Sequence, residues 1–334
     1  MALILILETV VAFLGDPRWR ASIAALAAVA LIGSACGAGD NRGANAEAPG
    51  ESRARVSVVA SVYPLVEAAR RIGGEGVDVV SLTPAGSEPH DLELTPRDVD
   101  ALEDADVVLY LGEGFQPAVQ ALAERRDGTT IDLLEGKPLR AGAGDADEHQ
   151  DESDHSAEDG LDPHVWLDPI LMIQMVGQIA DALSEVDPSG ANSYERNATR
   201  FVEELEELHA DLESGLADCR SRTIVTTHAA FGYLAARYGL EQESISGLSP
   251  EAEPDPERLD ELAELVEREG VTTIFTETLV TPEVAETLAR EAGVRTAMLN
   301  PLEGLSAEEL AAGGDYPSVM RENLAALREA LGCE

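Results

Sequence analysis

The segment SYERNATRFVEELEELHADLESGLA, residues 193–217, decides the fold. Its apolar positions recur at intervals of four, three, four, three, four and four residues, which is the spacing of one face of an α-helix. These positions are Tyr194, Ala198, Phe201, Leu205, Leu208, Leu212 and Leu216. A helix of 25 residues spans roughly 37 Å, which is longer than a small domain is wide. We therefore expect a long helix that connects two lobes.

Strand and helix patterns alternate on both sides of this helix, with short connections. Before it, strands are predicted near residues 56–60, 77–82, 106–111 and 129–133. After it, strands are predicted near residues 223–227, 241–245, 272–276 and 295–299. The βαβα order predicts parallel sheets with helices on both faces. The expected fold is α/β, with an N-terminal lobe at residues 56–188, a long linking helix at 189–217 and a similar C-terminal lobe at 218–334.

The chain of 334 residues is strongly acidic. Its 64 Asp and Glu residues against 23 Lys and Arg residues give a formal net charge of −41. Nucleic acid is excluded as a partner because phosphate binding needs clustered basic residues, and an anionic membrane surface is excluded for the folded part. The hydrophobic fraction of 44% is enough for a packed core. Lys137 is the only lysine, and this bias toward arginine usually reflects a GC-rich genome. The acid excess is then read as a trait of the whole proteome, and we hypothesise that it reflects adaptation to salt.

Part of the acidic charge is concentrated at residues 141–162. This segment holds nine carboxylates, His149 and His155, and it has no basic residue. Because such a composition cannot bury enough apolar surface to order the chain, the segment is predicted to be a disordered loop. Its two histidines either capture zinc weakly or belong to a solvated spacer.

The N-terminus has the pattern of an export signal. Two arginines precede an apolar run at residues 21–32, which is too short for a comfortable membrane span. Gly-Ser-Ala-Cys follows at residues 33–36 and resembles a bacterial lipobox. We expect residues 1–36 to be a signal peptide, Cys36 to be lipidated and residues 37–55 to be a flexible tether. The alternative is an ordinary cleaved signal in which Cys36 is a bystander.

Export places the expected protein on the extracytoplasmic face of the cell membrane, where only its lipid anchor holds it. The chain is expected to be a monomer. Two further cysteines, Cys219 and Cys333, are an even pair in an exported chain. They either form a disulfide or remain two buried thiols.

Three of the six histidines lie where a predicted strand has just ended or where a loop is tight. His90 and His228 follow predicted strands in different lobes, and His164 lies in the connection between the lobes. Ligands of open α/β sheets bind beyond the carboxyl ends of the strands. If these neutral imidazoles converge on one cleft, they form a site for a divalent transition metal, zinc above all. Taken singly, each histidine is more often a capping or hydrogen-bonded loop residue.

Several ordered motifs accompany these histidines. They are Pro89-His90-Asp91 with Thr95-Pro96, Asp162-Pro163-His164-Val165-Trp166-Leu167-Asp168-Pro169, Thr227-His228 followed by Ala230-Phe231-Gly232-Tyr233, and Ile274-Phe275-Thr276-Glu277. With these motifs, the chain from about residue 56 to its C-terminus resembles the metal-binding (cluster A) solute-binding lipoproteins of bacterial ABC importers, in particular the zinc-uptake branch. The resemblance implies two α/β lobes, a rigid linking helix and a metal held between the lobes.

The resemblance also implies which residues bind the metal. His90, His164 and His228 match the three histidine positions of the family, and members that prefer manganese commonly have Glu at the third position. His228 therefore favours Zn²⁺ over Mn²⁺, in agreement with the preference of imidazole for zinc. The implied function is high-affinity capture of Zn²⁺ and its delivery to the permease of an ABC transporter.

The fourth ligand stays open at this stage. Many members of the family supply a carboxylate near the last strand, where this sequence has Asn300. Water, Glu303 and Glu277 are the alternatives. Metal-bound imidazoles usually donate their other N–H to a carboxylate or a carbonyl, and Asp91 and Asp168 are candidates for that role. Asp168 is equally well placed to start the helix that follows it.

Two other classes of function are weighed against zinc uptake. Three histidines with an open fourth position can activate water in a zinc hydrolase, but the chain lacks His-Glu-x-x-His and has no glutamate spaced as an obvious general base. The protein is therefore expected not to be an enzyme. The remaining alternative is a manganese- or iron-binding protein, or an adhesin-like lipoprotein, of the same family.

Overall fold

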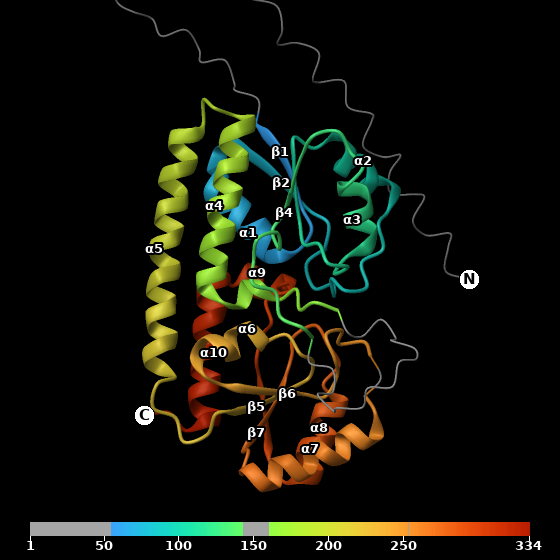
Figure 1. The fold of residues 1–334 in the computed structure, drawn as a ribbon, viewed down its shortest axis with the longest axis vertical. Helices are drawn as coiled ribbons and strands as arrows, with labels where there is room; N and C mark the ends of the chain where they lie inside the picture. The colour runs from blue at the N-terminus through green and yellow to red at the C-terminus, as the bar shows by residue number, and fades with distance from the viewer. Residues whose placement is uncertain (1–54, 143–159, 253) are drawn as a thin grey trace, which may run out of the picture. The chain divides into compact units, whose positions relative to one another are not determined.

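The computed structural model describes residues 55–142, 160–252 and 254–334, which belong to one compact unit. They form two four-stranded sheets in which neighbouring strands are parallel. The first lobe contains strands β1 (Val56–Ala60), β2 (Val77–Ser81), β3 (Val107–Tyr110) and β4 (Thr129–Asp132). The second lobe contains strands β5 (Thr223–Thr226), β6 (Glu241–Ser244), β7 (Thr273–Thr276) and β8 (Arg295–Met298). The prediction of an α/β fold with two similar lobes is confirmed (Figure 1).

The two sheets have the same topology. Their strand orders are β2-β1-β3-β4 and β6-β5-β7-β8, so in each lobe the first strand lies between the second and the third. The direction of the crossovers reverses beside this first strand, and such a switch point leaves a crevice beyond the carboxyl ends of its neighbours. Strands β1 and β3 flank this crevice in the first lobe, and β5 and β7 flank it in the second. Segments that leave the carboxyl edge of either sheet are therefore candidates for binding a ligand.

Helices flank both sheets. The first lobe carries α1 (Tyr63–Gly73), α2 (Pro96–Asp104) and α3 (Pro117–Ala123), and the second carries α6 (Gly232–Tyr238), α7 (Pro256–Glu269) and α8 (Glu283–Ala292). Every residue of the central strands β3, β5 and β7 is buried. Continuous apolar or β-branched runs suit these strands because neither face meets water. The central strands therefore supply much of the core of each lobe.

A pair of long helices follows the first lobe. Helix α4 (Pro169–Val186) packs along α5 (Ala191–Gly215), whose 25 residues extend roughly 37 Å. The seven apolar positions of the predicted stripe are all buried. Helix α5 packs against α1 of the first lobe and against α10 (Tyr316–Leu331), the last helix of the chain (Figure 1). It starts and ends two residues earlier than the sequence predicts, and Leu216 is buried just beyond its last turn.

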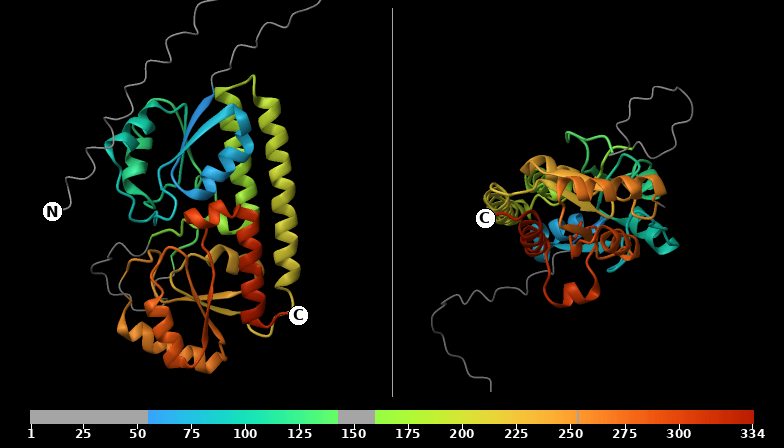
Figure 2. Two further views of the ribbon diagram at one scale, coloured as in Figure 1. Left: turned by 180° about the vertical axis from the view of Figure 1, so that it is seen from behind. Right: turned by 90° about the horizontal axis from the view of Figure 1, so that it is seen from below.

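Helix α10 returns to the first lobe and is bonded there. In Figure 2 it runs as a red helix beside the yellow α5. The backbone N–H of Tyr316, at the start of α10, donates to a carboxylate oxygen of Glu67 on α1 at 3.0 Å. Arg71, one turn farther along α1, pairs with Glu67 at 2.8 Å, with Glu204 of α5 at 2.6 Å and with Asp315 at 2.5 Å. This cluster joins α1, α5 and α10 through charged hydrogen bonds.

The structure adds short helices to the predicted elements. A 3₁₀ helix, η4 (Val165–Leu167), leads into α4, and α9 (Ala307–Ala311) precedes α10. Helix α9 starts at a capping box, in which the side chains of Ser306 and Glu309 each accept from the other's backbone N–H. The Ser-x-x-Glu spacing is visible in the sequence, but a helix of five residues is too short to show a period.

The described ends of the acidic segment lie together. Ala141 and Leu161 form an isolated antiparallel bridge, and the N–H of Gly142 donates to the carbonyl of Gly160 at 2.9 Å. The predictions for His149 and His155 lie outside the described residues. The same holds for the predicted signal peptide and for Cys36.

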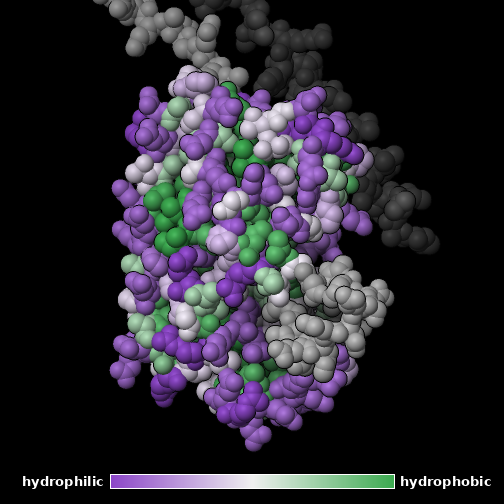
Figure 3. All heavy atoms as spheres, viewed as in Figure 1, coloured by the Kyte–Doolittle hydropathy of each residue, from purple (hydrophilic) through white to green (hydrophobic). Residues whose placement is uncertain are grey.

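The face of the molecule in Figure 3 is largely hydrophilic and shows only small, separate hydrophobic areas. This surface agrees with the acidic composition of the chain. Within residues 55–142, 160–252 and 254–334, we find no helix that combines the length and the apolar character needed to cross a bilayer.

Candidate metal centre

Three segments between elements carry the predicted histidines. His90 lies between β2 and α2, and His228 comes two residues after the end of β5. His164 lies between β4 and α4, immediately before η4. The side chains of His164 and His228 are fully buried, and that of His90 is 10% exposed. Because these imidazoles have little contact with water, their protein neighbours determine their protonation.

The three imidazoles meet around one carboxylate oxygen. Glu303 Oε1 lies 3.0 Å from His90 Nε2, 3.0 Å from His164 Nε2 and 3.2 Å from His228 Nε2. The four candidate donor atoms all lie within 4.8 Å of one another. A tetrahedral zinc ion with bonds of about 2.0–2.1 Å holds its ligand atoms about 3.3 Å apart. The three distances from Glu303 Oε1 are close to this value, and the four donor atoms together are near enough for one ion to contact them.

Glu303 lies in the segment between β8 and α9 and is 1% exposed. Its second oxygen, Oε2, is buried, and it has no hydrogen-bond partner among the described residues. Buried polar atoms are normally paired, so this oxygen has capacity left for a metal ion or an ordered water. Of the carboxylates considered from the sequence as a fourth ligand, the structure brings Glu303 to the Nε2 atoms.

Two other carboxylates bond the Nδ1 atoms of two imidazoles, on the side of each ring opposite Nε2. Asp162 Oδ1 lies 2.8 Å from His164 Nδ1, and Glu277 Oε2 lies 2.5 Å from His228 Nδ1. Each carboxylate also accepts from the backbone N–H of the same histidine, at 2.9 Å and 3.0 Å. A carboxylate at Nδ1 favours the tautomer that donates from Nδ1 and leaves the Nε2 lone pair for a metal. Glu277, a candidate fourth ligand in the sequence, therefore lies behind His228.

The carboxylates determine the proton affinity of the site. Burial opposes the charged form of both His164 and His228, but hydrogen bonds to Asp162 and Glu303 raise the pKa of His164. The charges of Glu277 and Glu303 raise the pKa of His228 well above its ordinary value. Burial lowers the pKa of His90, the most exposed of the three imidazoles. Against the effect of its own burial, His228 and the other imidazoles hold the pKa of Glu303 well below its usual range. The centre therefore attracts protons, and a dication must displace them.

The segment around His164 is bonded to the second lobe. The hydroxyl of Tyr233, on α6, donates to the carbonyl of Asp162 at 2.8 Å. The indole N–H of Trp166 donates to the carbonyl of Pro301 at 2.8 Å. His90, by contrast, packs against Phe115 of the first lobe, with ring centroids 4.7 Å apart. The centre therefore lies between the lobes and takes residues from both.

Comparison with known proteins decides the family. The model of the ZnuA family, described as zinc-uptake complex component A, periplasmic, matches residues 58–330. The chain belongs to the ZnuA family. It is 33% identical over 309 residues to the high-affinity zinc uptake system protein ZnuA of Bacillus subtilis (strain 168), an alignment that covers 92% of this chain and 96% of that protein.

Relatives with longer chains give a partial match. The zinc-binding protein AdcA of Streptococcus pyogenes serotype M1 is 39% identical over 286 residues, which are 82% of this chain. This chain spans only 56% of the length of that relative. Among solved structures, the Zn(II)-bound ZnuA-like domain of Streptococcus pneumoniae AdcA superposes with a TM-score of 0.70 at 36% identity, covering 83% of this chain and 99% of that chain.

Asp168 and Asp91 do not hold the imidazoles of this ZnuA-family site. Asp168 caps α4 by accepting from the N–H of Ile170 at 2.9 Å and pairs with Arg237 of α6 at 2.6 Å. Asp91 is exposed. The carboxylates at Nδ1 are instead Asp162 and Glu277, which the sequence reasoning did not place there. The spacing of Asp162, two residues before its histidine, is a usable signal because Asp side chains often bond the backbone two residues on.

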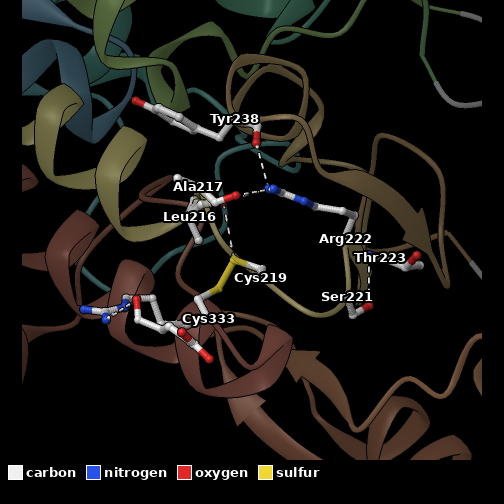
Figure 4. The surroundings of a disulfide bond; sticks show 10 residues. Leu216, Ala217, Cys219, Ser221, Arg222, Thr223, Tyr238 and Cys333 are labelled. Atoms are coloured by element: carbon white, nitrogen blue, oxygen red, sulfur yellow. Dashed lines mark hydrogen bonds between the residues drawn. A yellow bond between two sulfur atoms is a disulfide. The ribbon is translucent and has the colours of Figure 1, made fainter.

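Cys219 and Cys333 form a disulfide that spans 114 residues of sequence (Figure 4). The bridge joins the segment after α5 to the chain end after α10. In the same region, Arg222 donates to the carbonyls of Leu216 and Ala217, at 2.7 Å and 2.5 Å. These contacts attach the second lobe to the C-terminal end of α5, at the opposite end of β5 from His228.

Proposed function

We propose that this chain captures Zn²⁺ outside the cytoplasmic membrane and delivers it to the permease of an ABC importer. One observation carries the proposal: three imidazole nitrogens and one carboxylate oxygen, all from buried or nearly buried side chains, lie within 4.8 Å of one another. Zinc accepts this donor set in tetrahedral geometry. The relatives named above support zinc as the cargo, since their names describe zinc binding and zinc uptake.

Binding is favoured over catalysis. Catalytic zinc sites keep one coordination position open for water or substrate, whereas Glu303 supplies a fourth protein donor here. The family description is likewise that of a component of an uptake complex. We propose zinc over manganese because three imidazoles suit zinc better than a harder ion.

A competition titration tests the choice of metal. Purified, metal-free protein is titrated with Zn²⁺ and with Mn²⁺ against a chromophoric chelator. We expect one tight site for Zn²⁺ and binding of Mn²⁺ that is weaker by orders of magnitude. Equal or tighter binding of Mn²⁺ would reject the zinc assignment. Zinc-dependent turnover of ester or peptide substrates, lost on chelation, would reject the view that the protein is not an enzyme.

The histidine variants His90→Ala and His228→Ala test the site itself. Each removes one donor, so the zinc affinity of each variant should fall by at least about tenfold. His209→Ala is a matched control, because His209 is not one of the four candidate donors. It lies on α5, and its Nδ1 bonds the hydroxyl of Tyr238 on α6 at 3.1 Å. If the first two variants bind zinc as tightly as this control, the site assignment is wrong.

We also propose the membrane attachment that the sequence implies. Residues 1–36 act as a signal peptide, Cys36 carries the lipid, and residues 37–55 form a tether to a monomeric two-lobed domain. Incorporation of labelled palmitate should depend on Cys36, and Cys36→Ala should release the protein from membranes. Secretion of the unmodified chain by wild-type cells would reject the lipid anchor. A single species at the monomer mass in light scattering is expected.

The acidic segment is proposed to raise the rate of zinc capture. Eight of its nine carboxylates lie in residues 143–159 and concentrate dications near the site, and His149 and His155 add weak ligands. Deletion of residues 143–159 should lower the association rate at low ionic strength and leave the zinc Kd nearly unchanged. An unchanged association rate would show that the segment is only a spacer.

A further inference from the structure

The residue before Glu303 has an unusual backbone conformation. Leu302 is fully buried and has a φ of 58°, in the left-handed region. Side chains with a Cβ are disfavoured there, and single residues that adopt it are normally Gly, Asn or Asp. Among the described residues, Glu113 is the only other non-glycine with positive φ. Something must therefore hold Leu302 in this conformation, which sets the direction in which the chain enters Glu303.

The Asn300 side chain holds this turn from within. Its Oδ1 accepts from the backbone N–H of Leu302 at 2.8 Å, and its Nδ2 donates to Glu309 Oε1 at 3.1 Å. Glu309 is itself fixed, because its Oε2 accepts from the backbone N–H of Ser306 in the capping box of α9. Asn300 is 4% exposed, so water does not compete for these bonds. Both polar atoms of the Asn300 side chain are used in shaping the loop.

Asn323 bonds the backbone of Asn300 from outside the loop. It lies on α10 and is 2% exposed. Its Oδ1 accepts from the backbone N–H of Asn300 at 2.8 Å, and its Nδ2 donates to the backbone carbonyl of Asn300 at 2.7 Å. A side-chain amide that pairs with both backbone groups of one residue fixes its position as a strand neighbour would. The loop is thus attached to α9 through Glu309 and to α10 through Asn323.

We propose that Asn300 and Asn323 are positioning residues of the metal centre. They hold Leu302 in the left-handed conformation, and this conformation brings Glu303 Oε1 to the three Nε2 atoms. The inference rests on the proposed zinc-binding function and deepens it, because these two amides decide whether the fourth donor is the Glu303 carboxylate. Neither asparagine touches the ion. Their effect on zinc binding must therefore pass through Glu303.

A double-mutant cycle separates this role from a general structural one. Zinc affinity is measured by chelator competition for wild type, Asn300→Ala, Glu303→Ala and the double variant. We expect Asn300→Ala to weaken zinc binding about 10- to 100-fold in wild type, the range typical of residues that orient a ligand. In the Glu303→Ala background the same change should weaken binding by less than about threefold. Equal losses in both backgrounds, or no loss in wild type, would overturn the proposal.

Cobalt provides a readout that a loss of stability alone would not change. Co²⁺ replaces Zn²⁺ in such sites, and its visible spectrum reports the donor set. The spectrum of Co²⁺-loaded Asn300→Ala should shift to that of Glu303→Ala. Asn197→Ala is the matched control, since Asn197 Nδ2 donates to the carbonyl of Ile72 at 2.8 Å, away from the centre. Its spectrum should equal that of wild type. A wild-type spectrum for Asn300→Ala would reject the positioning role.

Two further variants test the same proposal if Asn300→Ala does not fold. Asn323→Ala removes the contacts from α10, and Asn300→Ser keeps a hydroxyl that can accept from Leu302. Each enters the same cycle with Glu303→Ala and should show the same dependence. If wild type itself fails to bind zinc, the proposed function is wrong. If wild type binds and the variants lose affinity independently of Glu303, only the positioning role is wrong.

Discussion

At the scale of single residues, the carboxylates behind the histidines matter as much as the donors. Asp162 and Glu277 each bond both the backbone N–H and the Nδ1 of one histidine. This double contact fixes the tautomer and the orientation of the ring together. The Nε2 atoms then face Glu303 without further adjustment. Folding therefore orders the ligands before zinc binds, and zinc binding loses little conformational entropy.

Asp162→Asn should weaken zinc binding about 10- to 100-fold, because the amide is a poorer acceptor and no longer favours the metal-binding tautomer of His164. Asp168→Asn is the matched control. Its carboxylate pairs with Arg237 and caps α4, so this variant should lose thermal stability but keep the wild-type zinc Kd. Chelator competition and a melting curve on both variants give the comparison. Equal zinc affinities for the two variants would contradict the assigned roles.

Zinc affinity should fall as the pH falls. Neighbouring carboxylates raise the pKa of His164 and of His228, so these imidazoles keep their protons to a higher pH than free histidine does. Each proton that zinc displaces steepens the dependence, up to about tenfold in Kd per pH unit. Calorimetry between about pH 6 and pH 8, in buffers of different ionisation enthalpy, measures the protons released. A constant Kd over this range would show that the raised pKa values are wrong.

The three histidines could be predicted as a set, because strand ends and the motifs around them mark their places. The bonding partners of those histidines could not. Glu277 follows β7 as His228 follows β5, and only the strand order shows that these two strands are neighbours. The role of Asn300 depends on contacts with α9 and α10, which no local spacing reveals. Sequence thus identifies donors more readily than it identifies the groups that orient them.

At the scale of elements, the buried stripe of α5 connects the parts of the fold. It packs against α4, α1 and α10, so one apolar face serves three neighbours. Such a face is strongly specified by its 3.6-residue period, and its residues were all predicted to be buried. The short helix α9 has no comparable period, because a capping box alone defines its start.

Leu205→Ala should lower the free energy of unfolding by about 2–5 kcal/mol, since Leu205 is fully buried in the main core and its loss leaves a cavity. The exposed neighbour Glu206 gives the control. Glu206→Ala should change the unfolding free energy by less than about 0.5 kcal/mol. Urea unfolding of the metal-free proteins measures both values. A similar effect from the two substitutions would contradict the assigned burial.

The disulfide should stabilise the second lobe. In the chain-entropy model, a bridge that closes a loop of 114 residues contributes on the order of 4–5 kcal/mol. The double variant Cys219→Ala/Cys333→Ala should therefore unfold at lower denaturant concentration, and reduced wild type should match it. Its zinc Kd should equal that of wild type, because neither cysteine contacts a metal donor. Unchanged stability after reduction would show that the bridge does not constrain the unfolded chain.

At the scale of the whole molecule, the charge of −41 opposes compactness.

The overall architecture followed from alternating patterns and one helical period, since both are repeated over many residues. Element ends were less predictable: β6 stops at Ser244, one residue before the predicted end, and α5 is displaced by two residues. Hydrogen bonds across the chain decide such ends, and a single sequence does not show them.

Salt should stabilise the protein. Screening weakens the repulsion among the carboxylates, so the melting temperature of the metal-free protein should rise by several degrees between about 10 mM and 1 M NaCl. Choline chloride at the same ionic strength is the control, because an effect of screening alone does not depend on the cation. A melting temperature that does not rise would count against the hypothesis of salt adaptation.

The bridge between Cys219 and Cys333 also has a consequence for proteolysis. His228, Glu277 and Glu303 all lie in the stretch of chain that it encloses. A protease that cuts one peptide bond anywhere in this stretch opens the ring but releases no fragment. The nicked protein would run as one band on a gel without reductant and as two bands with it. All four candidate donors therefore stay in one covalent molecule after damage that would divide an unbridged chain into separate pieces.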